Sequence, residues 1–396
     1  MNKQKESICN TVEALREELI GLSHDIHDNP ELGLEEFKAC AWQTALLKNH
    51  GFAVESPFCE METAFKATFD TGKEGAAVAF LSEYDALEGI GHGCGHNIIA
   101  ASAVGAAVAL AAALKESGAG GKVTLFGTPA EETEGGKIPM VEAGAFNGYD
   151  CALMMHPASE NIICRHGLAA QSVYVEFFGK AAHSSTPSAG INALASLISF
   201  FTSIDAIQQT WPNTSKINGI ITDGGKASNV ICEYARAAFT VRAARKKEIL
   251  VMYADMERAA QAAALVTGAK AKVSCGRLYA ERYPSRTLGE AFKANMAPLG
   301  EEMDYPDYNA QVGSSDIGNV SLVTPAIHEY LSIGDAAELI SHHESFRTAA
   351  ASKRADDVVL LAAKGLAMTG LDVMMDAALR AAMKDEFEKK VRPYQC

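Results

Sequence analysis

The hydrophobic pattern of the chain contains three short apolar runs, each of which ends abruptly in acidic residues or a histidine. They are AVAFLSEYD (77–85), KVTLFGTPAEE (122–132) and CALMMHP (151–157), and helical patterns separate them, notably an alanine-rich stretch at 98–115. This alternation of strand and helix predicts a mostly parallel sheet covered by helices. Because ligands bind beyond the carboxyl ends of the strands in such sheets, we expect the polar residues there to form a site.

The segment 168–280 has a different pattern, which predicts an inserted domain. Two helical segments, 192–209 and 247–266, lie among strands that alternate in polarity or resemble edge strands: SVYVEFFGK, INGIITDGG, EYARAAFTVRA and AKAKVSC. This mixture predicts an α+β domain. The flanking segments, 1–167 and 281–396, are expected to form together one α/β catalytic domain.

The composition is that of a folded protein of enzyme size. The 396 residues are too many for one compact core, and 48% are hydrophobic and 21% charged, so two domains are expected. The net charge of −14, from 49 acidic and 35 basic side chains, would repel phosphate backbones and anionic membrane surfaces. We therefore expect neither nucleic acid nor membrane partners.

Three features of the sequence favour a cytoplasmic location. The N-terminal segment MNKQKESICNTVEALREELI is amphipathic and lacks the apolar core of a signal peptide. The apolar stretch 98–114 is mostly alanine without flanking basic anchors, which is typical of a buried helix. Nine cysteines, scattered without short spacings, indicate a reducing compartment.

The glycine-rich turn GHGCGHN (91–97) carries the first candidate metal ligands, Cys94 and His96. A thiolate and an imidazole two positions apart can bind one divalent cation, for which zinc is the natural candidate. Taken alone, a Cys-x-His pair in a loop is more often incidental than a site.

Glu131, Glu132 and His156 follow or end the other two apolar runs. Adjacent carboxylates are usually solvated, and a lone histidine is usually packed or hydrogen-bonded. After a buried strand, however, one carboxylate can ligate a metal while its neighbour accepts a proton from metal-bound water. Because three strands of one sheet end in such groups, a di-metal cluster is the favoured interpretation.

Six motifs occur in order over almost the whole chain: HDNPELGLEE (27–36), SEYDALEGIGHGCGHN (82–97), PAEE (129–132), MMHP (154–157), GKAAHSSTPSAGINAL (179–194) and NVICEYARAAFTVR (229–242). With them the chain resembles the two-metal aminoacylase and carboxypeptidase family, which includes hippurate hydrolase and plant auxin-conjugate hydrolases. The Cys-Gly-His-Asn form is most similar to the branch that contains p-aminobenzoyl-glutamate hydrolase and β-alanyl-lysine dipeptidase.

The resemblance implies two divalent ions per chain, zinc or manganese, and five metal ligands: Cys94, His96, Glu132, His156 and His342. The alternative to the last ligand is its neighbour His343. Glu131 is implied to be the general base. Where the wider family has His-x-Asp, this chain has Glu83 two residues before Asp85, so Glu83 is not expected to be a ligand of the usual kind, whereas Asp85 is retained as a catalytic residue. Which ligand bridges the metals stays open.

The resemblance also assigns the inserted domain as a lid and dimerisation domain. His183 is implied to act across a homodimer, in the partner's active site, where it would stabilise the oxyanion of the intermediate. Asn229 and Arg242 are implied to bind the free carboxylate of the substrate, for which the planar guanidinium is suited. His328 is a further candidate for substrate binding. From the residues alone, His183 reads as a surface histidine and Arg242 as part of a structural ion pair.

These observations predict hydrolysis of an amide bond in a small N-acyl amino acid, a dipeptide or a p-aminobenzoyl-glutamate-like conjugate. The metals would polarise the carbonyl and lower the pKa of a bridging water, and Glu131 would pass the proton of that water to the leaving amine. The alternatives are a deaminase or another C–N hydrolase on the same di-metal site, a Cys94 nucleophile with His96 as its base, and a metal-binding protein without activity.

Overall fold

The computed structural model describes residues 2–307 and 312–394 and divides the chain into two compact units. Unit 2 is made mostly of one continuous segment in the middle of the chain. The bounds of unit 1 are Met1–His166, Arg282–Gln311 and Ser315–Cys396, and those of unit 2 are Gly167–Glu281 and Val312–Ser314.

Unit 1 contains a six-stranded sheet with the order β1-β2-β4-β3-β5-β10. The strands are β1 (Ala53–Glu55), β2 (Phe65–Asp70), β3 (Ala77–Ser82), β4 (Lys122–Gly127), β5 (Cys151–Ala158) and β10 (Ala326–Ser332). β4, β3, β5 and β10 run parallel to one another, whereas β1 and β2 are antiparallel to their neighbours. The predicted mostly parallel sheet is therefore confirmed, and its central strands are the three apolar runs of the sequence.

Side chains of β3 alternate between two hydrophobic cores, because successive residues of a strand point to opposite faces of the sheet. Val78 and Phe80 belong to the larger core, and Ala79 and Leu81 belong to the smaller one. Both faces of the sheet are therefore covered, which explains why the parallel strands read as continuous apolar runs rather than as alternating patterns.

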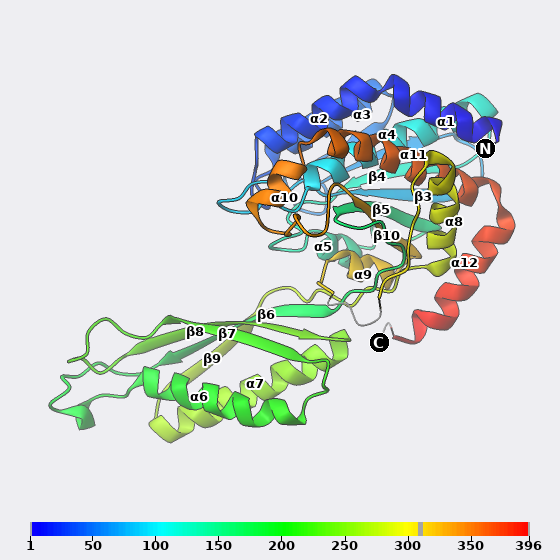
Figure 1. Cartoon of the computed structure of the whole chain (residues 1–396). Helices are drawn as coiled ribbons and strands as arrows, with labels where there is room; N and C mark the ends of the chain where they lie inside the picture. The colour runs from blue at the N-terminus through cyan, green and yellow to red at the C-terminus, as the bar shows by residue number, and fades with distance from the viewer. Residues whose placement is uncertain (1, 308–311, 395–396) are drawn as a thin grey trace. The chain divides into compact units, whose positions relative to one another are not determined.

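Helices α4 (His96–Ser117) and α11 (Lys353–Met375) pack together over the larger core, and α1 (Lys3–Ala14) and α2 (Arg16–Asp28) lie on them (Figure 1). The smaller core is closed by α5 (Lys137–Glu142) and α9 (Ile317–Ser321). Four further α-helices of unit 1 are α3 (Phe37–Asn49), α8 (Arg286–Met296), α10 (Glu344–Ala349) and α12 (Ala377–Lys390).

Two helices of the described part of the chain, α4 and α11, are long and apolar enough to cross a membrane by length and composition. In each of them, however, most of the apolar window is buried inside the protein, 94% in α4 and 78% in α11. A helix that is apolar on all sides is typical of a core helix surrounded by other elements. The expected buried helix at 98–114 is confirmed as the interior of α4.

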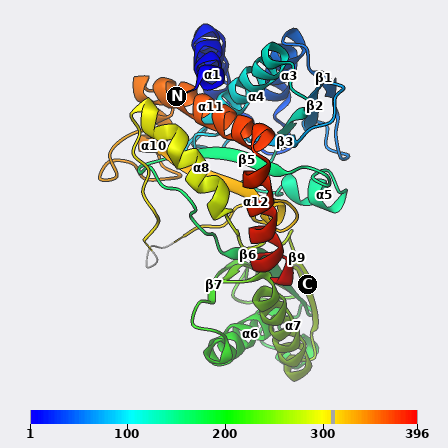
Figure 2. The same cartoon turned by 90° about the vertical axis from the view of Figure 1, so that its right-hand side faces the viewer.

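Unit 2 contains a four-stranded antiparallel sheet with the order β7-β8-β6-β9. Its strands are β6 (Ala169–Phe178), β7 (Lys216–Asp223), β8 (Tyr234–Ala243) and β9 (Lys270–Cys275). The helices α6 (Ala193–Ile207) and α7 (Lys246–Thr267) lie side by side against one face of this sheet (Figure 2). The other face is only partly covered, which accounts for the alternating polarity of β6.

Candidate metal centre

The carboxyl ends of β3, β4 and β5 bring the candidate side chains to one edge of the sheet in unit 1. The groups that follow or end these strands are Glu83, Asp85, Glu131, Glu132 and His156. Helix α4 begins at the same edge, directly after the glycine-rich turn. Parallel strands thus place residues from three separate sequence motifs in one location, as the sequence pattern predicted.

Gly95 lies between Cys94 and His96 in the turn before α4, and its backbone conformation positions both of these residues. Its φ of 76° lies in the left-handed region, and a Cβ at this position would lie 2.7 Å from Cγ of Pro157. A residue with a side chain would therefore strain the backbone and displace Pro157, which is the neighbour of His156. This glycine fixes the distance between the turn and the end of β5.

Two groups of possible metal ligands share Cys94. The first consists of Cys94, His96 and His156, and the second of Cys94, Glu132 and His342; within each group the ligand atoms lie within 4.8 Å of one another. Sγ of Cys94 is 3.4 Å from Nε2 of His156, and Oε1 of Glu132 is 3.3 Å from Nε2 of His342. Ligands bound to one ion at about 2.0 to 2.3 Å in a tetrahedral site lie about 3.3 to 3.7 Å apart. The spacing fits two ions, with Cys94 common to the two groups of possible ligands.

The hydrogen bonds of His96 and His156 leave the same ring nitrogen available for a metal. Nδ1 of His96 pairs with Oδ1 of Asp85 at 2.9 Å, and Nδ1 of His156 pairs with the carbonyl oxygen of Pro157 at 2.7 Å. Nε2 of His96 is buried and has no hydrogen-bond partner among the described residues. Such acceptors fix the tautomer in which Nε2 carries the lone pair, as is usual for metal-binding histidines. The donor set therefore fits a divalent cation.

Glu36 holds the turn that presents Glu131 and Glu132. Ala130 lies at a φ of 59°, which is unusual for a residue with a side chain, and its N–H donates to Oε1 of the buried Glu36 at 2.8 Å. The other oxygen of Glu36 accepts a hydrogen bond from Oγ1 of Thr63 at 2.7 Å. The geometry of this turn thus depends on a carboxyl group that is remote in the sequence.

The adjacent glutamates have different electrostatic surroundings. Burial, together with repulsion from Glu83, raises the pKa of Glu131 well above its ordinary value. Burial acts in the same direction on Glu132, but the hydrogen bond from His342 and the charge of His96 hold its pKa below the ordinary value. Two carboxyl groups whose pKa values are pushed apart are typical of a site in which one group binds a proton and the other stays anionic.

His342 and His343 occupy different environments. His342 has a φ of 61°, and its N–H donates to the carbonyl oxygen of Gly93, which brings its ring toward Glu132. Nδ1 of His343 accepts a hydrogen bond from the backbone of Ser345 and thereby caps α10. Of the two, only His342 belongs to a group of possible metal ligands within the described part of the chain.

Comparisons with known proteins agree on one family. Residues 169–267 match the M20 peptidase dimerisation domain. A solved structure of a Bacillus subtilis protein, described as a dinuclear metal binding peptidase from the M20 family, has the same fold: the TM-score is 0.68 at 20% identity, over 91% of this chain and 99% of that one. The chain is 38% identical to the Xaa-Arg dipeptidase of Mus musculus over 99% of this chain and 94% of the mouse protein. The chain belongs to the M20 peptidase family.

A bacterial relative is less similar to this chain. One of the subunits of the p-aminobenzoyl-glutamate hydrolase of Escherichia coli strain K12 is 30% identical over 77% of this chain and 66% of that protein. These comparisons confirm the family that the sequence motifs indicated, and with it a metal-dependent hydrolase of amide bonds in small conjugates. They do not separate the candidate substrates, because the relatives act on different ones.

Three of the predicted site residues of this M20 chain lie in unit 2. His183 is exposed, with Nδ1 2.7 Å from Oγ of Ser185. The adjacent N–H of Ser184 donates to the carbonyl oxygen of Asn229, so the segments of His183 and Asn229 lie side by side. Arg242 lies on β8 and donates from Nη1 to Oγ of Ser314 at 2.7 Å. The roles of these three residues stay predictions.

His328 is part of a buried cluster beside His156. Its Nδ1 pairs with Nη1 of Arg282 and lies 3.1 Å from the hydroxyl of Tyr330, and its ring centroid is 5.2 Å from that of His156. Burial and the charge of Arg282 lower the pKa of His328 well below its ordinary value. Nε2 of this neutral ring is buried without a hydrogen-bond partner among the described residues, so it can bind a polar group of a ligand.

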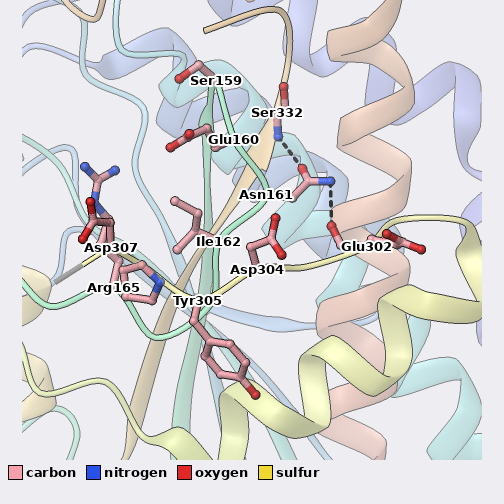
Figure 3. A pocket seen from close by; sticks show the side chains of 11 residues that line it. Ser159, Glu160, Asn161, Ile162, Arg165, Glu302, Asp304, Tyr305, Asp307 and Ser332 are labelled. Atoms are coloured by element: carbon pink, nitrogen blue, oxygen red, sulfur yellow. Dashed lines mark hydrogen bonds between the residues drawn. The ribbon is translucent and has the colours of Figure 1, made fainter. Parts of the chain in front are cut away.

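A cavity of ≈ 880 Å³ is lined at the carboxyl ends of β5 and β10 by Ser159 and Ser332 (Figure 3). His156 lies on β5, three residues before Ser159. Four carboxylates line the cavity: Glu160, Glu302, Asp304 and Asp307. Its one guanidinium group, that of Arg165, lies over the ring of Tyr330 at 5.3 Å, and this ring is 5.7 Å from the ring of His156. The cavity is therefore predominantly anionic. The ring of Tyr330 connects the guanidinium group of this cavity to His156, a candidate metal ligand.

Sequence reasoning missed several residues that the fold brings to this region: Glu36, Lys137, Arg282, Asp316 and Tyr330. Lys137 follows the Glu131-Glu132 pair by only five residues, and Asp316 lies in the conspicuous segment GSSDIGN. The nearness of Lys137 to the glutamate pair and the place of Asp316 in that segment were the sequence signals that could have identified these two residues. A lysine in a glycine-rich loop is normally solvated, so its burial could not be recognised from the sequence.

Proposed function

We propose that the protein is a di-metal dipeptidase that hydrolyses the amide bond before a C-terminal amino acid. The observation that carries this proposal is the pair of ligand groups that share Cys94, one with His96 and His156 and the other with Glu132 and His342. The thiolate and imidazole donors favour zinc, and manganese is the alternative. When bound, two such cations would polarise the amide carbonyl and lower the pKa of a water molecule.

In this proposal, side chains of the protein transfer the protons and position the groups that react. Glu131, beside the ligand atoms of His96 and Glu132, accepts the proton of the attacking water at its carboxylate and delivers it to the leaving amine. Asp85 is a positioning residue in this scheme, because Oδ1 fixes the tautomer of His96 while Oδ2 accepts the backbone N–H of Glu132 at 2.9 Å. His328 is positioned to orient the substrate through Nε2.

The substrate that we propose carries a basic C-terminal residue. The mouse relative is an Xaa-Arg dipeptidase, and the cavity next to His156 carries four carboxylates against one guanidinium. An anionic cavity attracts a cationic side chain and repels a glutamate side chain, so p-aminobenzoyl-glutamate fits it less well. Ser159, which lines the cavity, is three residues after His156, or about 10 Å along an extended chain, which is within reach of an arginine side chain.

A substrate panel tests this proposal. Metal-stripped protein, with and without added zinc or manganese, is assayed on Xaa-Arg and Xaa-Lys dipeptides, matched Xaa-Glu dipeptides, N-acyl amino acids and p-aminobenzoyl-glutamate. We expect metal-dependent release of arginine or lysine, with kcat/KM at least about tenfold above the Xaa-Glu peptides. A preference for acidic residues would contradict the basic substrate, release of ammonia would indicate a deaminase, and metal-independent turnover would contradict the metal centre.

We further propose that the protein is a homodimer in which His183 completes the partner's active site. Residues 169–267 match a peptidase dimerisation domain, and unit 2 exposes apolar side chains on β7 and α6, including Ile220, Ile221 and Ile198. Asn229 and Arg242 would bind the substrate carboxylate, the guanidinium in bidentate form. A cytoplasmic location is proposed as well, since seven of the cysteines that the structure describes, from Cys40 to Cys275, are not in disulfides.

Subunit complementation tests the role of His183. His183→Ala and Glu131→Gln are each expected to be nearly inactive as homodimers. If His183 acts in the partner's site, a co-expressed mixture regains up to about a quarter of the wild-type activity, because half of the dimers are mixed and each has one intact site. A mixture as inactive as the two parents, despite mixed dimers detected by differential tagging, would place His183 in its own subunit's site or outside the reaction.

A further inference from the structure

A second cluster of acidic side chains lies directly beside the metal centre and contains a lysine instead of a metal. The possible ligand atoms of Glu83, Glu131 and Asp316 lie within 4.8 Å of one another, and all three residues are buried. Nζ of the buried Lys137 is 2.6 Å from Oε1 of Glu83 and 2.7 Å from Oδ1 of Asp316. The ammonium group therefore occupies this cluster.

The backbone fixes the position of the ammonium group. Lys137 is the first residue of α5, and its N–H donates to Oδ2 of Asp316 at 2.9 Å, while its side chain returns to Oδ1 of the same carboxylate. Asp316 directly precedes α9, which packs against α5. The lysine is thus held at both ends, and its charge has a defined place in the interior.

Glu131 is shared by the two clusters. Its carboxylate lies within 4.8 Å of the ligand atoms of His96 and Glu132 on one side, and of Glu83 and Asp316 on the other. Three buried carboxylates without a cation would repel one another. The charge of Lys137 offsets this repulsion, and Glu131 can then keep a defined position between the two clusters.

We propose that Lys137 is a positioning residue for the general base. Its ammonium group fixes Glu83 and Asp316, and these carboxylates in turn hold Glu131 in the orientation in which it takes a proton from water. The inference rests on the proposed amide hydrolysis with Glu131 as the base. It assigns a role to Lys137, Glu83 and Asp316 without making any of them a metal ligand.

The test compares Lys137→Met, which retains the length of the side chain without its charge, with Lys122→Met. Lys122 is a half-exposed lysine whose Nζ lies 3.4 Å from Asp70, at the other end of β4, so this control removes a lysine ion pair remote from the site. For Lys137→Met, normalised to metal-loaded protein, we expect kcat to fall on the order of a hundredfold because the base is misplaced. We expect KM to change by less than about threefold, because substrate binding is not altered.

Two readouts besides activity separate this role from a structural one. Metal analysis of Lys137→Met is expected to give the same number of ions per chain as the wild type. Crystal structures of the metal-free variant and of the metal-free wild type are expected to differ in the orientation of the Glu131 carboxylate, which turns away from Glu83 and Asp316 in the variant. The double variant Lys137→Met/Asp316→Asn, which removes one of the repelling charges, is expected to recover at least about tenfold in kcat, as coupled residues in one network do.

The inference is overturned if kcat of metal-loaded Lys137→Met stays within about threefold of the wild type, or if its loss is explained entirely by lost metal. If Lys137→Met does not fold, Glu83→Gln replaces it, since it keeps the pair between Lys137 and Asp316; wild-type kcat in that variant also overturns the inference. A wild-type protein without activity on any amide substrate would instead contradict the proposed function, so the two failures are distinguishable.

Discussion

Replacement of Glu131 by glutamine is expected to lower kcat about a thousandfold while the protein keeps its metal ions. Glutamine has nearly the same size and can still accept a hydrogen bond, but it cannot take a proton from water, and general base catalysis contributes about 10²- to 10⁴-fold to rates. The carboxylate lies beside the ligand atoms of His96 and Glu132 but belongs to neither ligand group that contains Cys94. Steady-state kinetics and metal analysis on the same samples measure both quantities.

Glu134→Gln is the matched control for this experiment. Glu134 lies in the same turn, three residues after Glu131, but its side chain is exposed. The same chemical change there is expected to leave kcat unaltered. A Glu131→Gln enzyme with kcat within about tenfold of the wild type would show that another group takes the proton. Loss of metal together with activity would make Glu131 a ligand instead.

Replacement of Cys94 by alanine is expected to remove most of the bound metal and with it all measurable turnover. Cys94 is the one residue shared by both ligand groups, so its loss weakens two metal positions at once, whereas loss of His156 or His342 affects one. Even residues that only orient a ligand change metal affinity about 10- to 100-fold when mutated, so loss of a shared ligand has a larger effect. Metal content after dialysis against a weak chelator measures the change.

Cys151→Ala provides the control for loss of a buried thiol. Cys151 is fully buried at the start of β5, five residues before His156, and belongs to no group of possible metal ligands in the described part of the chain. It is expected to keep its full metal content and to lose only stability, by about 1 to 3 kcal/mol for a small core cavity. Full metal occupancy in Cys94→Ala would refute the shared ligand, and loss of only one ion would place Cys94 at a single metal.

The sequence by itself determined the elements and the approximate location of the site. The apolar runs that became β3, β4 and β5 are continuous because both faces of a parallel sheet are buried, and the polar residues after them must therefore meet at one edge. The same local logic predicted a buried helix at 98–114, which is the interior of α4, and an inserted α+β domain at 168–280. Ordered motifs then identified the family.

Only the tertiary structure decided which groups lie together within that site. The pairing of Cys94 with both His156 and Glu132, the approach of His342 to Glu132, and the hydrogen bond from Ala130 to Glu36 all join residues remote in the chain. Lys137 and Asp316 are 179 positions apart. Periodicity reports the face on which a side chain lies, but the burial of a charge depends on the carboxylates that surround it in space, and these come from other strands and helices.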